Sequence, residues 1–295
     1  MNSHLTEYEI DMLITNLTHL VTKCDYNSYA YIKNSMDQLI IPFPAISIKV
    51  GKYLYRARRH LNNEDFFDEI SDISHRPDIF NITDFGRANE PCQSIFYCSD
   101  QHEIAIAETS PILRHDLDLE YDIITTGIWR VKKELRVASL LNYPLNEVQN
   151  PAQQFLDTKA KELIESFRND NTDQLLKLHR FFSNEFIKPP NENSRKYLIS
   201  CAFSNYIYGN AGYDTYLKET TELDGLIYPS AVFPIFGMNL ALKPSVIIDG
   251  KIILIGARKS KLLKQNDKQY GEVETFDTED ISHDNNKINW NKVST

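Results

Sequence analysis

The stretch A-I-S-I-K-V-G-K-Y-L-Y-R-A-R, residues 45–58, marks a change from helical to extended patterning that decides the fold class. Ile46, Ile48 and Val50 alternate with polar residues, and this period of two predicts a strand. A Gly-Lys break then separates it from a second predicted strand, which is rich in tyrosine and arginine. The chain is therefore expected to enter a sheet here.

Helices are expected on both sides of this stretch. Upstream, residues 5–22 place apolar side chains on one face of an amphipathic helix, and a second helix is expected at about 27–40. Downstream, residues 151–209 carry three helical patterns in succession, which predicts an all-helical insertion. Residues 60–93 are expected to be mainly loop with some short helix. Further strands are predicted at 94–99, 124–132, 136–141, 224–230, 239–244 and 251–259.

This order of elements predicts an α+β protein with mixed or antiparallel sheets and a helical insertion. The expected organisation is an N-terminal helical segment (1–44), a main domain (45–260) and an acidic, flexible tail (261–295). Trp290 is the one large anchor of that tail. Where the strand at 94–99 runs into the next helix, Ser99 or Asp100 is expected to cap that helix.

Composition limits the functional classes. The 295 residues include 32 Lys plus Arg against 41 Asp plus Glu, for a formal charge of −9. This charge argues against direct binding of a nucleic-acid backbone over a broad surface. Four cysteines without metal-ligand spacing predict reduced thiols, no apolar run is long enough to span a membrane, and the acidic N-terminus does not resemble an export signal. These features predict a cytoplasmic protein.

Common catalytic and cofactor motifs are missing. The sequence contains no G-x-G-x-x-G, no phosphate-binding P-loop and no G-x-S-x-G. His102 and Glu103 begin an H-E-x-x-H pattern, but Ile106 stands where the second histidine would be needed. We therefore expect neither a metal nor a bound cofactor.

Three separate segments place polar residues on apolar strands or at strand–helix junctions. In the first, Arg56 lies among aromatic residues, where a guanidinium needs solvent, a carboxylate or a ligand. For Arg56 taken alone, an exposed edge-strand arginine paired with a neighbouring acid is the simpler interpretation. In the second, Glu108 shares a helix face with Ile104 and Ala105, which would turn it inward. An ordinary exposed helix glutamate is the alternative.

The same second segment contains Arg87 and Tyr97, and Tyr97 taken alone favours a core position over a ligand-binding one. In the third segment, Ser230 follows a strand that ends in proline and is well placed to face a cleft. A turn serine is the simpler interpretation. Asn239 begins the strand that follows.

Together these segments resemble the RES-domain family, which is named for its Arg, Glu and Ser. The matching pieces are LYRAR (54–58), GRAN through SIFYCS to AIAE (86–108), and DGLIYPS with NLAL (224–242). The resemblance covers roughly 45–145 and 220–260. The chain departs from the family at Ala88, where an aromatic residue is frequent, and in the long helical insertion.

The resemblance implies an ADP-ribosyltransferase-like fold, a RES-like catalytic domain at 45–260 and cleavage of NAD+. NAD+ would be a substrate, with water or phosphate as the acceptor. The family residues fall on Arg56, Glu108 and Ser230. Glu108 would stabilise positive charge on the ribose, Arg56 would hold the diphosphate, and Ser230 would orient the carboxamide or the ribose. Tyr97 would stack against the nicotinamide, and Arg87 and Asn239 would also contact substrate.

By the same resemblance, the chain would be a toxin inhibited by a cognate Xre-type antitoxin. A homodimer is a separate expectation, which the resemblance does not supply. Two other functions remain open. The fold would also suit an ADP-ribosyltransferase that modifies a macromolecule. Alternatively, the chain would be a non-catalytic binding module in which the helical insertion docks a partner.

Overall fold

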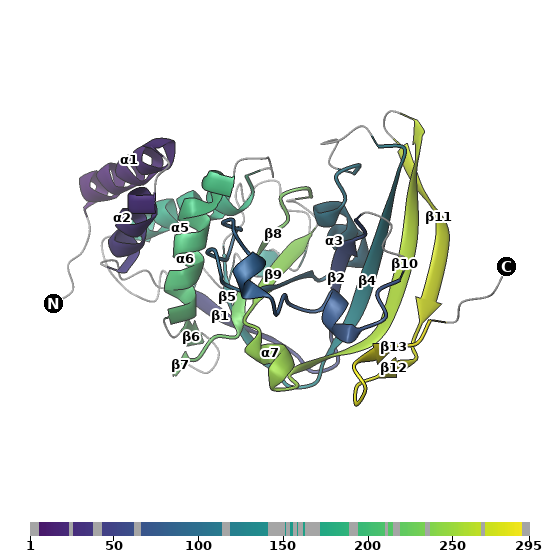
Figure 1. Ribbon diagram of the computed structural model, residues 1–295. Helices are drawn as coiled ribbons and strands as arrows, with labels where there is room; N and C mark the ends of the chain where they lie inside the picture. The colour runs from purple at the N-terminus through teal and green to yellow at the C-terminus, as the bar shows by residue number, and fades with distance from the viewer. Residues whose placement is uncertain are drawn as a thin grey trace. The chain divides into compact units, whose positions relative to one another are not determined.

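The computed structural model describes residues 6–23, 26–37, 43–61, 66–113, 119–140, 172–188, 194–209, 212–214, 219–233, 237–266 and 269–290, together with 151, 154–155, 158 and 162. Helices and a mixed set of strands confirm the predicted α+β class (Figure 1). The chain divides into two compact units. Unit 1 takes residues 1–47, 79–93 and 136–236, and unit 2 takes 48–78, 94–135 and 237–295.

Unit 1 contains a group of packed helices. They are α1 (Glu7–Lys23), α2 (Tyr26–Asp37), α5 (Thr172–Phe186), the short 3-10 helix η4 (Ser194–Tyr197) and α6 (Leu198–Gly209). The rings of Phe182 and Phe203 stack 4.0 Å apart and join α5 to α6. The helices predicted at 5–22 and about 27–40 are confirmed. The first helix of the predicted insertion falls largely outside the described residues.

The described residues of the same unit also form five strands and the 3-10 helix η2 (Ile79–Asn81). The strands are β1 (Pro44–Ile48), β5 (Leu135–Ser139), β6 (Gly212–Asp214), β7 (Glu219–Thr221) and β8 (Gly225–Pro229). The pairs β5–β8 and β1–β6 are parallel, whereas β6–β7 is antiparallel. The Asp224 carboxylate accepts a hydrogen bond of 2.9 Å from the Arg136 amide, and this contact fixes the register beside β8.

Unit 2 is built on antiparallel strands in the order β11-β10-β4-β2-β3-β9 (Figure 1). Their bounds are β2 (Tyr53–Arg59), β3 (Phe96–Ser99), β4 (Tyr121–Val131), β9 (Met238–Leu242), β10 (Ile252–Asn266) and β11 (Gln269–Thr278). Shorter elements complete the unit: η1 (Ile70–Ile73), α3 (His102–Thr109), α7 (Ser245–Ile248), β12 (Ile281–Ser282) and β13 (Lys287–Ile288).

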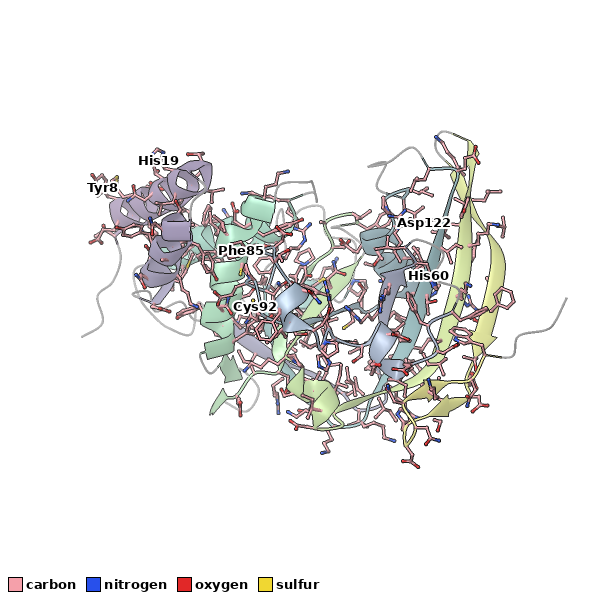
Figure 2. The ribbon with its side chains drawn as sticks, in the orientation of Figure 1. Tyr8, His19, His60, Phe85, Cys92 and Asp122 are labelled. Atoms are coloured by element: carbon pink, nitrogen blue, oxygen red, sulfur yellow. The ribbon has the colours of Figure 1, made fainter. Side chains whose placement is uncertain are left out.

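Different segments cover the two faces of this sheet, and Figure 2 labels one residue from each face, Asp122 and His60. On the face covered by α3, which we call the helix face, Asp122 accepts hydrogen bonds from Arg59 at 2.6 Å and Ser110 at 2.8 Å. On the opposite face, which we call the loop face, the His60 ring stacks on Phe67 at 4.1 Å. Because neighbouring residues of a strand point to opposite faces, the residues of β2 divide between these two environments.

The C-terminal residues correct one prediction. Residues 261–295 were expected to form a flexible tail, but β10 runs on to Asn266 and pairs with the ten-residue strand β11. Beyond β11, the Trp290 indole N–H donates a 2.9 Å hydrogen bond to the Phe67 carbonyl, and its ring lies 5.2 Å from that of Phe66. Trp290 is therefore an anchor, as expected, but of an ordered segment.

Candidate functional site

Glu108 lies in the last turn of α3, half-buried against the helix face. Its Oε1 atom accepts a 2.7 Å hydrogen bond from the side-chain amide of Asn239. Asn239 is itself fixed, because its Oδ1 atom accepts a 2.5 Å bond from the Ser99 hydroxyl and its backbone pairs with that of Ser99. Ser99 and Asn239 are both buried. The carboxylate is thus oriented by two neighbouring strands, unlike an ordinary exposed helix glutamate.

Neither residue expected to cap α3 does so. The N-cap position is Gln101, which makes no capping bond with its side chain. Ser99 instead donates to Asn239, and the Asp100 carboxylate accepts a 3.1 Å bond from the Met238 amide. Burial raises the pKa of Asp100 above its usual range. The prediction was wrong because long-range strand pairing took both side chains away from the helix end.

Arg56 lies on the loop face of the central strand β2 and is half-buried. Its Nε donates to the Ser74 carbonyl and its Nη1 to the Tyr97 carbonyl, both at 2.9 Å, while its guanidinium lies over the Phe96 ring. Burial lowers its pKa to about 10, so it remains protonated at neutral pH. Among the described residues, no carboxylate pairs with Arg56, so the alternative of an edge-strand ion pair does not hold.

Arg56 lies at the place where strands β2 and β3 stop pairing. Strands β2 and β3 share a single residue pair, Tyr55 with Ser99, although β2 pairs with β4 along its whole length. Arg56 follows that last pair, and its bond to the Tyr97 carbonyl bridges the diverging strands. Paired residues point to the same face, so Ser99 shares the helix face with Tyr55, and Arg56 points to the opposite face.

The structure therefore gathers four predicted site residues in unit 2, but in two groups. Glu108 and Asn239 are in direct contact on the helix face. Arg56 reaches only the main chain of Tyr97. The Tyr97 side chain is half-buried and, by its position in β3, lies on the same face as Ser99.

The other two predicted residues belong to unit 1. Ser230 follows β8 and is fully buried, and its hydroxyl oxygen accepts hydrogen bonds from the Val232 and Phe233 amides at 3.1 and 3.0 Å. These bonds fit the alternative of a turn serine. Ser230 was expected to face a cleft, and the structure instead gives it no exposed surface.

Arg87 is also buried. Its Nη1 donates a 2.5 Å hydrogen bond to the Phe186 carbonyl at the end of α5, and its guanidinium lies 4.9 Å from the centre of the Tyr197 ring. Its Nη2 is buried and has no hydrogen-bond partner among the described residues. The contact with Phe186 attaches the loop at 86–93 to the helices of unit 1.

Sequence analysis missed two residues of this region. Ser99 was expected to cap a helix, and its role in holding Asn239 depends on a strand that lies 140 positions away. His75 was treated as part of a loop. In the structure its Nδ1 lies 3.3 Å from the Ser74 hydroxyl, while burial and the nearby Arg56 charge lower its pKa. No spacing pattern in the sequence connects His75 with Arg56.

Comparison with known proteins gives no relative for this chain: no family model, no curated protein and no solved structure matches it. Within the part of the chain that the structure describes, no cluster of three or more His, Cys, Asp or Glu side chains is arranged to hold a metal ion. A function for this chain therefore follows only from the chemistry of its own residues.

Proposed function

We propose that this chain is an NAD+-degrading enzyme that cleaves the bond between nicotinamide and ribose. The observation that carries the proposal is the Glu108 carboxylate, held by the Asn239 amide at 2.7 Å and through it by Ser99. A carboxylate held in place in this way can stabilise positive charge without reorganising during the reaction. The resemblance of three segments to the RES-domain family supports the same chemistry.

In the proposed reaction, the bond from the anomeric carbon to the nicotinamide nitrogen breaks, and nicotinamide leaves with both electrons. Positive charge develops on the ribose, as in glycoside cleavage. Glu108 stabilises this charge and accepts a hydrogen bond from a ribose hydroxyl. An oxygen of water or phosphate then bonds to the anomeric carbon, and a water molecule that attacks releases one proton to solvent.

Arg56 is the residue proposed to hold the diphosphate. It is protonated and, among the described residues, has no carboxylate partner, so an anionic ligand is the counter-ion that it lacks. Because Arg56 and Glu108 point to opposite faces, the proposal requires NAD+ to reach both where β2 and β3 stop pairing. Arg87 and Ser230 remain predictions from the resemblance.

The test is NAD+ consumption by the purified protein with and without phosphate, followed by separation of the products. Glu108→Gln preserves size and removes the charge, and it should lower kcat by about 10²-fold or more. Glu103→Gln is the matched control, because this exposed glutamate lies on the same helix. It should retain the rate of the unmodified protein.

Free nicotinamide with ADP-ribose would identify water as the acceptor, and a phosphorylated ADP-ribose formed only with phosphate would identify phosphate. Transfer of labelled ADP-ribose to a protein would instead favour a macromolecular transferase. A Glu108→Gln protein that folds normally and keeps its full NAD+ turnover would disprove the proposed role of Glu108.

We further propose that the enzyme works in the cytoplasm. Cys98 and Cys201 are buried free thiols, which suits a reducing compartment. None of the described helices is both long and apolar enough to cross a membrane.

A further inference from the structure

The segment that follows η1 brings a histidine next to Arg56. The Ser74 carbonyl accepts the hydrogen bond from Arg56 Nε at 2.9 Å. The Ser74 hydroxyl lies 3.3 Å from His75 Nδ1. One residue therefore connects the guanidinium to the imidazole, and both of these side chains are half-buried and so still reach solvent.

Positive charge surrounds this pair. Arg58 lies on the same face of β2, where it donates to the Asp72 carbonyl at 2.6 Å and stacks over the Phe67 ring. Arg76 follows His75 directly and is paired with the Asp78 carboxylate at 2.9 Å. Among the described residues, Arg56 is the charged group that acts on His75. The Asp78 carboxylate is thus paired with Arg76. Among the described residues, no carboxylate pairs with Arg56 or His75.

We propose that Arg56 and His75 together form a binding site for a tetrahedral oxyanion, and that His75 takes up a proton when the anion binds. The ligand chemistry is that of a phosphate or phosphoryl group, and its assignment to the substrate or co-substrate of the enzyme rests on the proposed function. Arg56 supplies a permanent charge with donors left over from its two carbonyl bonds. His75 supplies a second donor, and whether its ring is charged depends on whether the anion is bound.

The proton uptake by His75 follows from the change in charge around its ring when an anion binds. Without an anion, burial and the Arg56 charge lower the His75 pKa and keep the ring neutral. A bound dianion offsets the Arg56 charge and favours the imidazolium, so the pKa rises. Binding is then coupled to proton uptake, and affinity must increase as pH falls through the range between these two pKa values.

Sulfate is the probe for this site, because it remains a dianion throughout the range in which phosphate changes its own charge. Its binding is measured calorimetrically between pH 5.5 and 8 in two buffers that differ in ionisation enthalpy, so that proton uptake is read directly. We expect sulfate affinity to rise by about 10-fold from pH 7.5 to pH 5.5, which corresponds to a pKa difference of about one unit.

His75→Gln keeps a neutral hydrogen-bonding side chain and should bind sulfate with an affinity that does not change with pH. His283→Gln is the control, because His283 is exposed in a turn of the same unit, and it should behave like the unmodified protein. Two results would overturn the proposal. One is binding without proton uptake by the unmodified protein, a measurement that needs no variant. The other is an unchanged pH dependence in a folded His75→Gln.

Competition assigns the source of the anion. If NAD+ displaces sulfate, the site holds the diphosphate of the dinucleotide. If phosphate displaces sulfate while NAD+ binds beside it, the site holds a free phosphate co-substrate. Displacement by neither would overturn the proposal. Because sulfate binding needs no turnover, loss of NAD+ cleavage with intact pH-linked binding would count against the proposed function alone.

Discussion

Asn239 is the residue on which the proposed chemistry most depends after Glu108. Its amide has two ends, and each has a defined partner: the oxygen accepts from Ser99 and the nitrogen donates to Glu108. This arrangement fixes which way the amide points. Asn239 was predicted to contact substrate, and this stays a prediction. Its contacts in the structure are with Ser99 and Glu108, so we propose that it orients the Glu108 carboxylate.

Asn239→Ala should reduce kcat by about 10-fold or more, because the carboxylate loses the donor that orients it. Asn239→Asp should be more damaging, since a second carboxylate beside Glu108 raises the cost of keeping both ionised. The measurement is the ratio of kcat to KM for each variant together with its pH profile. Asn285→Ala, in an exposed turn, is the control. An Asn239→Ala protein with unchanged kcat would reduce Asn239 to a structural residue.

At the scale of elements, η1 and β4 approach each other closely at Gly127. A Cβ atom added there would lie 2.8 Å from Trp129 Nε1 and 2.9 Å from a methyl group of Ile73. Both neighbours are fully buried in the core. The absence of a side chain at Gly127 therefore lets η1 pack on the loop face. Gly127 pairs with Arg56 of the neighbouring strand β2, so η1 packs on the same face as Arg56.

Gly127→Ala should lower the free energy of unfolding by about 1–3 kcal/mol, because the buried neighbours must shift to make room. Gly209→Ala is a matched control at the end of α6, where a Cβ would meet nothing within 4 Å. It should have little effect. Denaturant unfolding of both variants tests the comparison, and equal stabilities would contradict the close approach at Gly127.

Local patterns predicted the elements that have a clear apolar face, and missed those that depend on distant partners. The apolar spacing of α1 and the alternation in β1 and β2 were sufficient for those elements. Strand β11 was missed because its residues G-E-V-E-T-F-D-T carry charge on a solvent-facing side, and its order comes from pairing with β10. The helix position of Glu108 was predictable, but its bond to Asn239, 131 positions away, was not.

At the scale of the whole molecule, pH should act on stability through histidines that are buried in the uncharged state. Burial lowers the pKa of both His75 and His102 below the ordinary value of 6.5. Below that pH the unfolded chain binds protons that the folded chain does not bind. The stability contributed by the neutral rings is therefore complete above pH 6.5 and decreases as pH falls toward the folded-state values.

Denaturant midpoints should accordingly fall between pH 7.5 and pH 6.0, and the double variant His75→Gln, His102→Gln should lose most of this dependence. The range stops at pH 6.0 because burial raises the pKa of Asp100 and Glu185, and protonation of such carboxyl groups stabilises the folded chain at lower pH. A double variant with the same decrease as the unmodified protein would remove these histidines as the cause.

The two units also interleave along the chain, and this has a consequence for synthesis on the ribosome. Unit 2 takes Arg56 and Glu108 from early segments, but Asn239 and the long strands β10 and β11 come from its last segment. A nascent chain that ends anywhere before Asn239 carries the proposed acidic group without the amide that orients it. Translation therefore delays assembly of the Glu108–Asn239 pair until most of the polypeptide has been made.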